Sequence, residues 1–133
     1  MFRIKYSREI ALKILYELDA LKCDAAQAGP VVDEYFRSFR GPNPDEEEFI
    51  RRLVKTVVED RKEIDAAIAA NLIGWKLNRL ALVDRNLLRM AIAEARFNSE
   101  KPIIIDDVLR IAKKYSEADS YNLINAILDK VIP

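Results

Sequence analysis

Apolar side chains recur at intervals of three and four residues through most of the 133-residue chain. Near the N-terminus one such stripe consists of Ala11, Ile14, Leu15 and Leu18. Because an α-helix turns once in about 3.6 residues, these side chains share the face that a packed helix buries. Stripes of the same kind follow in the later segments, so the spacing predicts helices along the chain.

Capping and breaking residues predict where these helices begin and end. Ser7 is suited to accept the free amide hydrogens of a helix start, so the first helix is predicted to begin near Arg8. Gly29 and Pro30 predict a stop and a new start, with a helix over about 31–39. The other predicted segments are 46–73 before Gly74, one opened by Asp84, one from Pro102 to Tyr115, and a last one starting at Asp119 or Ser120.

Two segments leave alternatives open. The pattern over 46–73 fits one bent helix or two, with Glu59-Asp60 as the favoured break. The apolar run over 103–105 suits a strand by residue type, but no second strand is there to pair with it, so we interpret it as the start of a helix. The predicted fold class is all-α: one compact domain of about six or seven helices, with subdomains over about 1–73 and 74–133 that share a core.

The charge and the rare residues exclude several functional classes. The 22 basic and 22 acidic side chains balance, so attraction to a polyanion requires a local patch, and segment 24–48 is acidic. Cys23 is the only cysteine and histidine is absent, which argues against a disulfide, a zinc or haem site, a cofactor and a histidine-based catalyst. The sequence predicts a cytoplasmic protein that is not an enzyme and has no membrane segment.

Several residues in the chain invite a second interpretation beyond packing. Trp75 is expected first to fill a gap between helices. Asp84 and Asp119 are expected to be helix caps, and Tyr16 is either the edge of the core or an exposed anchor. Asparagine is not favoured inside helices, and for Asn125 a hydrogen bond to the backbone at a helix crossing is favoured over a ligand contact.

Three runs of the sequence, taken together, resemble the NusB family of bacterial transcription antitermination factors. They are SREIALKILYELD near the start, WKLNRLALVDRNLLRMAIAE after the middle, and KPIIIDDVLRIAKKYSEADSYNLINAILDK near the end. The resemblance implies an all-α fold and a role without catalysis. It implies partners as well: boxA RNA, the small-subunit ribosomal protein called NusE, and the antitermination complex on RNA polymerase, with a homodimer as a further possibility.

The resemblance also assigns roles to individual residues. For RNA binding it implies the basic arm before the first helix and the start of the last helix: Arg3, Lys5, Arg8, Tyr121, Asn122, Leu123 and Asn125. For the ribosomal partner it implies Tyr16, Asp84 and Asp119. These types fit their roles, because cations hold phosphates, rings and amides meet unpaired bases, and acids bind a basic protein.

The sequence departs from the family pattern at three places. The arm carries Arg3 and Lys5 in place of a compact arginine cluster, which predicts a weaker electrostatic contribution to RNA affinity. Leu123 stands where an aromatic residue is common, and Ala126 stands where glycine is usual. Two other functions compete with antitermination: a helical scaffold that dimerises and binds no nucleic acid, and a free-standing relative of the RNA-binding domain of ribosomal RNA cytosine methyltransferases.

Overall fold

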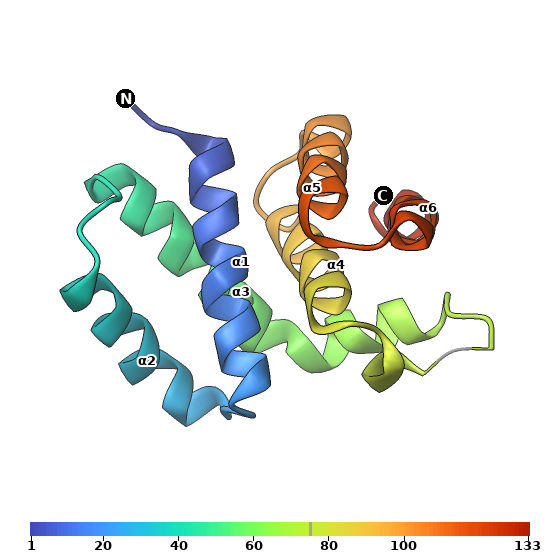
Figure 1. Ribbon diagram of the computed structural model, residues 1–133, viewed down its shortest axis with the longest axis horizontal. Helices are drawn as coiled ribbons and strands as arrows, with labels where there is room; N and C mark the ends of the chain where they lie inside the picture. Colours follow the sequence, from blue (N-terminus) through green and yellow to red (C-terminus); the bar gives the residue numbers. More distant parts are fainter. Residues whose placement is uncertain (75) are drawn as a thin grey trace.

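The computed structural model describes residues 1–74 and 76–133, and within them the chain is helical without any strand (Figure 1). The helices of these residues are α1 (Ile4–Ala20), α2 (Ala25–Ser38), α3 (Pro44–Ala69), the short 3-10 helix η1 (Leu77–Arg79), α4 (Leu82–Glu94), α5 (Lys101–Tyr115) and α6 (Ala118–Val131). The prediction of an all-α fold is confirmed, and the run over 103–105 lies in α5. Trp75, expected to fill a gap between helices, lies outside the described residues.

The first helix begins earlier than predicted. It starts at Ile4, so Ser7 lies within its first turn, where its hydroxyl donates to the carbonyl of Arg3 at 2.8 Å and does not cap. The cause lies in α3, where the Glu46 carboxylate accepts the backbone amide of Arg3 at 2.7 Å. The predicted free basic arm is therefore wrong, because an ionic and hydrogen-bonded anchor holds the chain at Arg3.

The predicted break at Gly29-Pro30 is wrong as well, since both residues lie inside α2. The helix starts ahead of them at a capping box: the Asp24 carboxylate accepts the amide of Gln27, and the Gln27 side chain accepts the amide of Asp24, both at 2.9 Å. Reciprocal capping satisfies two of the orphan amides of a helix start. Pro30 sits in the second turn, where it removes a single hydrogen bond to the turn before it.

The segment 46–73, which the sequence left as one helix or two, forms one helix from Pro44 to Ala69. Its start is set by a second capping box between Asn43 and Glu46, with Pro44 in the first helical position. Its fully buried side chains continue past the expected break at Glu59-Asp60, from Ile50 and Leu53 to Ile64 and Ile68. An unbroken apolar face explains the unbroken helix.

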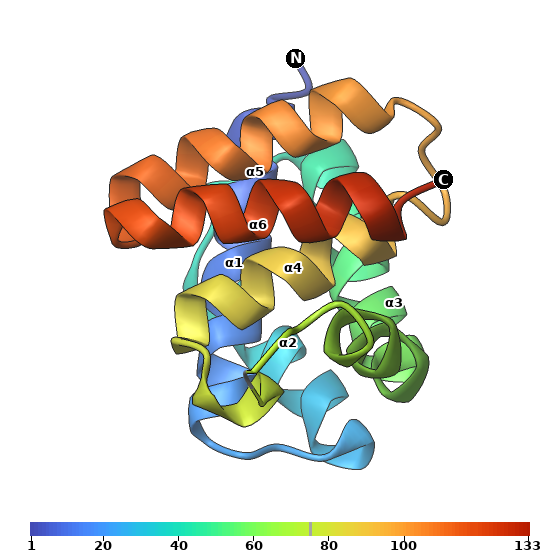
Figure 2. The ribbon, with the colours of Figure 1, turned by 90° about the vertical axis from the view of Figure 1, so that its right-hand side faces the viewer.

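Helix α4 lies at the centre of the arrangement. It packs against α1 and α3 on one side and against α5 and α6 on the other. Helices α4, α5 and α6 all pack against one another, and Figure 2 shows α5 and α6 running in opposite directions. Leu87, Leu88, Met90 and Ala91 of α4 are completely buried in the single core cluster of the described residues. The segments before and after residue 74 thus pack onto the same central helix.

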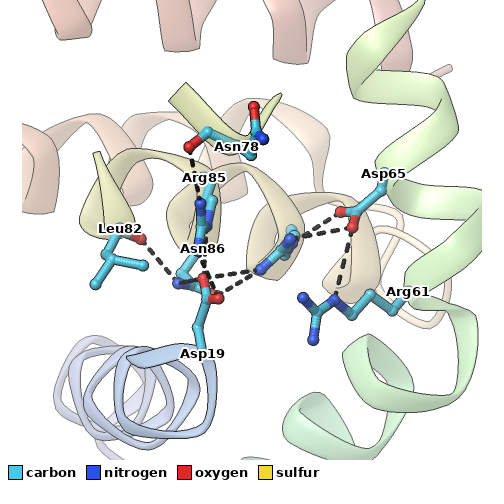
Figure 3. A network of polar contacts seen from close by, with 8 residues as sticks. Asp19, Arg61, Asp65, Asn78, Leu82, Arg85 and Asn86 are labelled. Atoms are coloured by element: carbon cyan, nitrogen blue, oxygen red, sulfur yellow. Dashed lines mark hydrogen bonds and ion pairs between the residues drawn. The ribbon is translucent and has the colours of Figure 1, made fainter. Parts of the chain in front are cut away.

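A polar network reinforces the contact of α4 with α1 and α3 (Figure 3). Asp19 of α1 accepts two hydrogen bonds from Arg85, both of 2.6 Å, and one each from Asn86 and Arg89. Arg89 also makes a two-pronged contact with Asp65 of α3, at 2.8 and 3.0 Å. Burial opposes ionisation of Asp19, but the bonds from Arg85 and Asn86 and the nearby guanidinium groups outweigh it, so its pKa is lowered. The carboxylate therefore stays charged and joins the helices.

Candidate functional site

The three residues that the sequence assigns to a protein partner line one groove. Tyr16 comes from α1, Asp84 from the first turn of α4 and Asp119 from the first turn of α6. The groove has a volume of about 710 Å³ and lies where these helices approach the end of α5. Residues separated by up to 103 positions in the chain, from Tyr16 to Asp119, thus line one groove.

Asp84 is buried where it lines this groove, and both of its carboxylate oxygens accept hydrogen bonds. One carboxylate oxygen accepts the Ser116 hydroxyl and the other accepts the Ser120 hydroxyl, each at 2.6 Å. These serines flank the turn that joins α5 to α6. The carboxylate therefore fixes that turn to the start of α4.

The expectation that Asp84 and Asp119 cap helices is wrong in detail. The residues that precede α4 and α6 are Ala81 and Glu117, and neither makes a capping hydrogen bond through its side chain. Both aspartates lie inside the first turn, where a negative charge still interacts favourably with the positive end of the helix dipole. Their placement at two helix starts brings both acids to the groove.

The lining of the groove combines acidic and apolar groups. Asp84, Glu117 and Asp119 carry negative charge there, and Arg79 is the basic residue of the lining. The apolar part of the lining comes from Tyr16, Leu80, Leu82, Val83, Tyr115 and Leu123. Tyr16 and Tyr115 are exposed on the surface. Exposed aromatic rings beside acids are suited to a basic protein surface with apolar anchors.

The residues predicted to bind RNA divide into exposed and buried groups. Lys5 is exposed on α1. Arg3 is half exposed, with its guanidinium 4.1 Å from the centre of the Tyr6 ring and in contact with the buried Glu46 at 2.8 Å. The hydrogen bond from Arg3 is the main cause that lowers the pKa of Glu46 to about 2. Arg3 is thus held in place, with part of its surface open to solvent.

Arg8 does not fit the predicted RNA-binding role. Its side chain is 1% exposed and points into the interior, where it contacts Glu94 and Asp107 at 2.7 and 3.0 Å. Burial opposes the charged form, but the hydrogen bonds that Arg8 donates to both carboxylates, together with their negative charge, outweigh it and raise the pKa of Arg8. Because phosphate has no access to this guanidinium, the prediction for Arg8 is corrected to an internal ion-pair role.

The start of α6 presents amide groups to solvent. Asn122 and Asn125 are exposed, and the Asn125 side chain makes no hydrogen bond to any described residue, which overturns the expected backbone contact. Tyr121 is half buried, with the Lys113 amine 5.0 Å from the centre of its ring. Leu123 turns into the groove that holds Asp84. Tyr121, Asn122 and Asn125 thus lie on one short stretch of α6, and Leu123 lies on the side of the groove.

Sequence reasoning missed the residues that hold these groups in place. The sequence indicates Ser120 only as a possible helix start and assigns nothing to Ser116, yet both hydroxyls bond to one carboxylate. Glu46 stands out only as part of the acidic segment 24–48. Its capping box with Asn43 was a readable signal, whereas its contact with Arg3, 43 positions away, was not.

Two classes of site receive no support in the described part of the chain. Residues 1–74 and 76–133 contain no group of three histidine, cysteine, aspartate or glutamate side chains arranged to hold a metal ion. No helix among them is both long and apolar enough to cross a membrane.

Comparison with known proteins gives a consistent result. The sequence model described as the NusB family matches residues 5–133. A protein named transcription antitermination protein NusB from Desulforamulus reducens is 36% identical over 130 residues, which cover 96% of this chain and 88% of that one.

Solved structures agree in fold. A NusB structure from T. maritima superposes with a TM-score of 0.82 at 28% identity and covers 99% of this chain and 92% of its own. A structure of antitermination factors NusB and NusE in complex with double-stranded RNA gives a TM-score of 0.84 at 28% identity, covering 96% of this chain and 94% of that chain.

Proposed function

The chain belongs to the NusB family, and on that basis we propose that it is a transcription antitermination factor. In this role it binds boxA-type RNA together with the small-subunit ribosomal protein NusE and joins the RNA polymerase antitermination complex, supporting ribosomal RNA transcription. The structure of NusB and NusE with RNA, whose fold this chain shares, supports both kinds of partner. The role is one of binding without catalysis, and its place is the cytoplasm.

The groove between α1, α4 and α6 is the proposed binding site for the ribosomal protein. The observation that carries this proposal is the convergence of Tyr16, Asp84 and Asp119 on one groove with an acidic and aromatic lining. Asp119 is exposed and faces a partner directly, whereas Asp84 is buried and acts by holding the α5–α6 turn. A cationic protein gains favourable electrostatic steering from such a surface.

The proposed RNA surface comprises the start of α1 and the start of α6. Arg3 and Lys5 contribute positive charge, and Tyr121, Asn122 and Asn125 contribute a ring and amide groups. Unpaired RNA bases are recognised by stacking on aromatic rings and by hydrogen bonds to their edges, while cations hold the phosphates. If the fold is divided into the predicted helical subdomains over about 1–73 and 74–133, each subdomain contributes one part of this proposed surface.

A titration of boxA-type RNA with the protein, alone and with purified NusE, tests the function. We expect weak binding alone that decreases with added salt, and tighter binding when NusE is present. A scrambled RNA of equal length and composition is the control, and equal affinity of the protein pair for both RNAs contradicts the proposal. Light scattering at several concentrations, run beside it, detects a homodimer and tests the alternative of a scaffold that self-associates without RNA.

A further inference from the structure

Helix α5 lies beside α1 and carries a group of cations to which neither the sequence nor the proposed function assigns a role. Arg110, Lys113 and Lys114 lie within its last turn and a half, and Lys113 and Lys114 are exposed. Lys5 extends the same surface on α1, one turn before Glu9, which contacts Arg110 and Lys114. We name Arg110, Lys113 and Lys114 the α5 ridge.

The ridge is cationic at its surface because its acids lie beneath its bases. Lys114 is 54% exposed and contacts Glu9, which is 20% exposed, at 2.9 Å. Arg110, itself partly exposed, contacts Asp107, which is buried and also receives Arg8 from the interior. Two exposed acids weaken the field at either side of the ridge: Asp106 in the N-terminal half of α5, and Glu117 just after its end. The positive charge that solvent meets is thus concentrated in the last turn of α5, even though the ion pairs nearly balance in number.

The acid beneath the ridge is Glu9. Burial tends to raise its pKa, but the hydrogen bonds and positive charges of Lys114 and Arg110 outweigh burial, so its pKa is lowered. Glu9 accepts hydrogen bonds from Lys114, from Arg110 at 3.3 Å and from the Tyr115 hydroxyl at 3.4 Å. One carboxylate shared by these groups holds the two cations in position without covering them. Side chains that are already ordered lose less conformational freedom when a ligand binds.

Aromatic rings accompany the cations along the ridge. The Lys113 amine lies over the Tyr121 ring at 5.0 Å, and the Lys114 amine lies over the Tyr115 ring at 5.3 Å. Alternating cations and rings match a single-stranded nucleic acid, whose phosphates pair with the cations while its bases stack on the rings. An acidic protein segment would use the cations and leave the rings without stacking partners.

The position of the α5 ridge also fits an RNA path. At one end, Lys113 covers Tyr121 of α6, and at the other end, Glu9 links the ridge to the α1 helix that carries Lys5. These ends are the two separate regions proposed above to contact RNA. We propose that the last turn of α5 is the middle section of the RNA path, with Lys113 and Lys114 as phosphate contacts that join the α1 and α6 contacts into one continuous surface. This inference rests on the proposed function, because it assumes that RNA binds at both ends.

Lys113→Gln combined with Lys114→Gln tests the proposal, since glutamine removes the charge and has nearly the helix propensity of lysine. The measurement is the affinity of the protein with NusE for boxA-type RNA at several salt concentrations. Each lost phosphate contact on a single strand lowers the magnitude of the salt slope by about 0.7. At 0.1 M salt this corresponds to a roughly fivefold loss of RNA affinity, so the double variant is expected to lose affinity by about 25-fold. Lys55→Gln combined with Lys62→Gln on α3 removes the same charge from outside the ridge and is the matched control.

The outcomes separate the two proposals. A reduced slope and affinity in the α5 variant, with the α3 variant unchanged, supports the ridge. Unchanged RNA binding by the α5 variant, while the wild-type protein prefers boxA, overturns the ridge and leaves the proposed function intact. Failure of the wild-type protein to prefer boxA overturns the proposed function first. If the α5 variant loses NusE and retains RNA, the ridge is a protein contact and the RNA path is wrong.

Discussion

The groove and the α5 ridge are built from the same types of charged residue but present opposite charge. In the groove, Asp84 is satisfied by the neutral hydroxyls of Ser116 and Ser120, so its charge is not cancelled by a base. In the ridge, Glu9 lies beneath Lys114 and Arg110, so the cations are more exposed to solvent than the carboxylate. A chain with zero net charge thus acquires a basic surface where bases lie over their acids, and an acidic surface where an acid is hydrogen-bonded to neutral hydroxyls.

Arg8 supports the α5 ridge from the interior, because it shares Asp107 with Arg110, and its loss should have the largest effect on stability. Arg8→Ala leaves the buried Glu94 without its arginine and leaves Asp107 with Arg110 alone, and removal of one member of a buried ion pair costs about 3–5 kcal/mol. We expect a loss of that size in the free energy of unfolding, measured by urea titration. Arg3→Ala is the control because Arg3 is half exposed, and its expected loss is smaller. Equal losses for the two variants would show that Arg8 is not a buried support.

These two arginines show how far sequence reasoning reaches in this chain. The apolar spacing was sufficient for the all-α fold, because burial of a stripe is a local property of each helix. The choice between surface and interior for Arg3 and Arg8 was not local. It depends on Glu46, Glu94 and Asp107, which lie 43, 86 and 99 positions away from their respective arginines.

The site shows the same division between local and distant information. The resemblance to a family selected Tyr16, Asp84 and Asp119, and the structure brings them to one groove. It could not indicate that Asp84 is bonded to two serines, since that requires the start of α4 to meet the α5–α6 turn. Helix starts were misplaced where a distant carboxylate or a capping box overrode the serine or the glycine-proline pair.

The groove side of the comparison is tested by a pair of aspartate variants. Asp84→Ala leaves two partly buried hydroxyls without their acceptor, so we expect a loss of about 1–3 kcal/mol in the free energy of unfolding. Asp119→Ala changes an exposed residue and should stay within about 0.5 kcal/mol of the wild type. Both variants should bind NusE more weakly in a calorimetric titration. If Asp119→Ala is as unstable as Asp84→Ala, then Asp84 does not hold the turn.

The smallest expected effect concerns the contact between Arg3 and Glu46, which anchors the start of α1, and it depends on pH. Glu46 has a pKa of about 2 in the folded protein against 4.5 as its ordinary value, chiefly through the hydrogen bond from Arg3. A carboxyl group whose pKa is lowered by folding stabilises the protein above its unfolded pKa, and that stability is lost as the pH falls through the folded pKa. Glu46→Gln should therefore lower the Tm at pH 7, and the difference from the wild type should shrink as the pH falls from about 4.5 toward 2.

Glu48→Gln, at an exposed position on the same helix, should show no such trend. A Tm difference that stays constant over this range would mean that Arg3 is anchored by the shape of the side chain at position 46 and not by its charge.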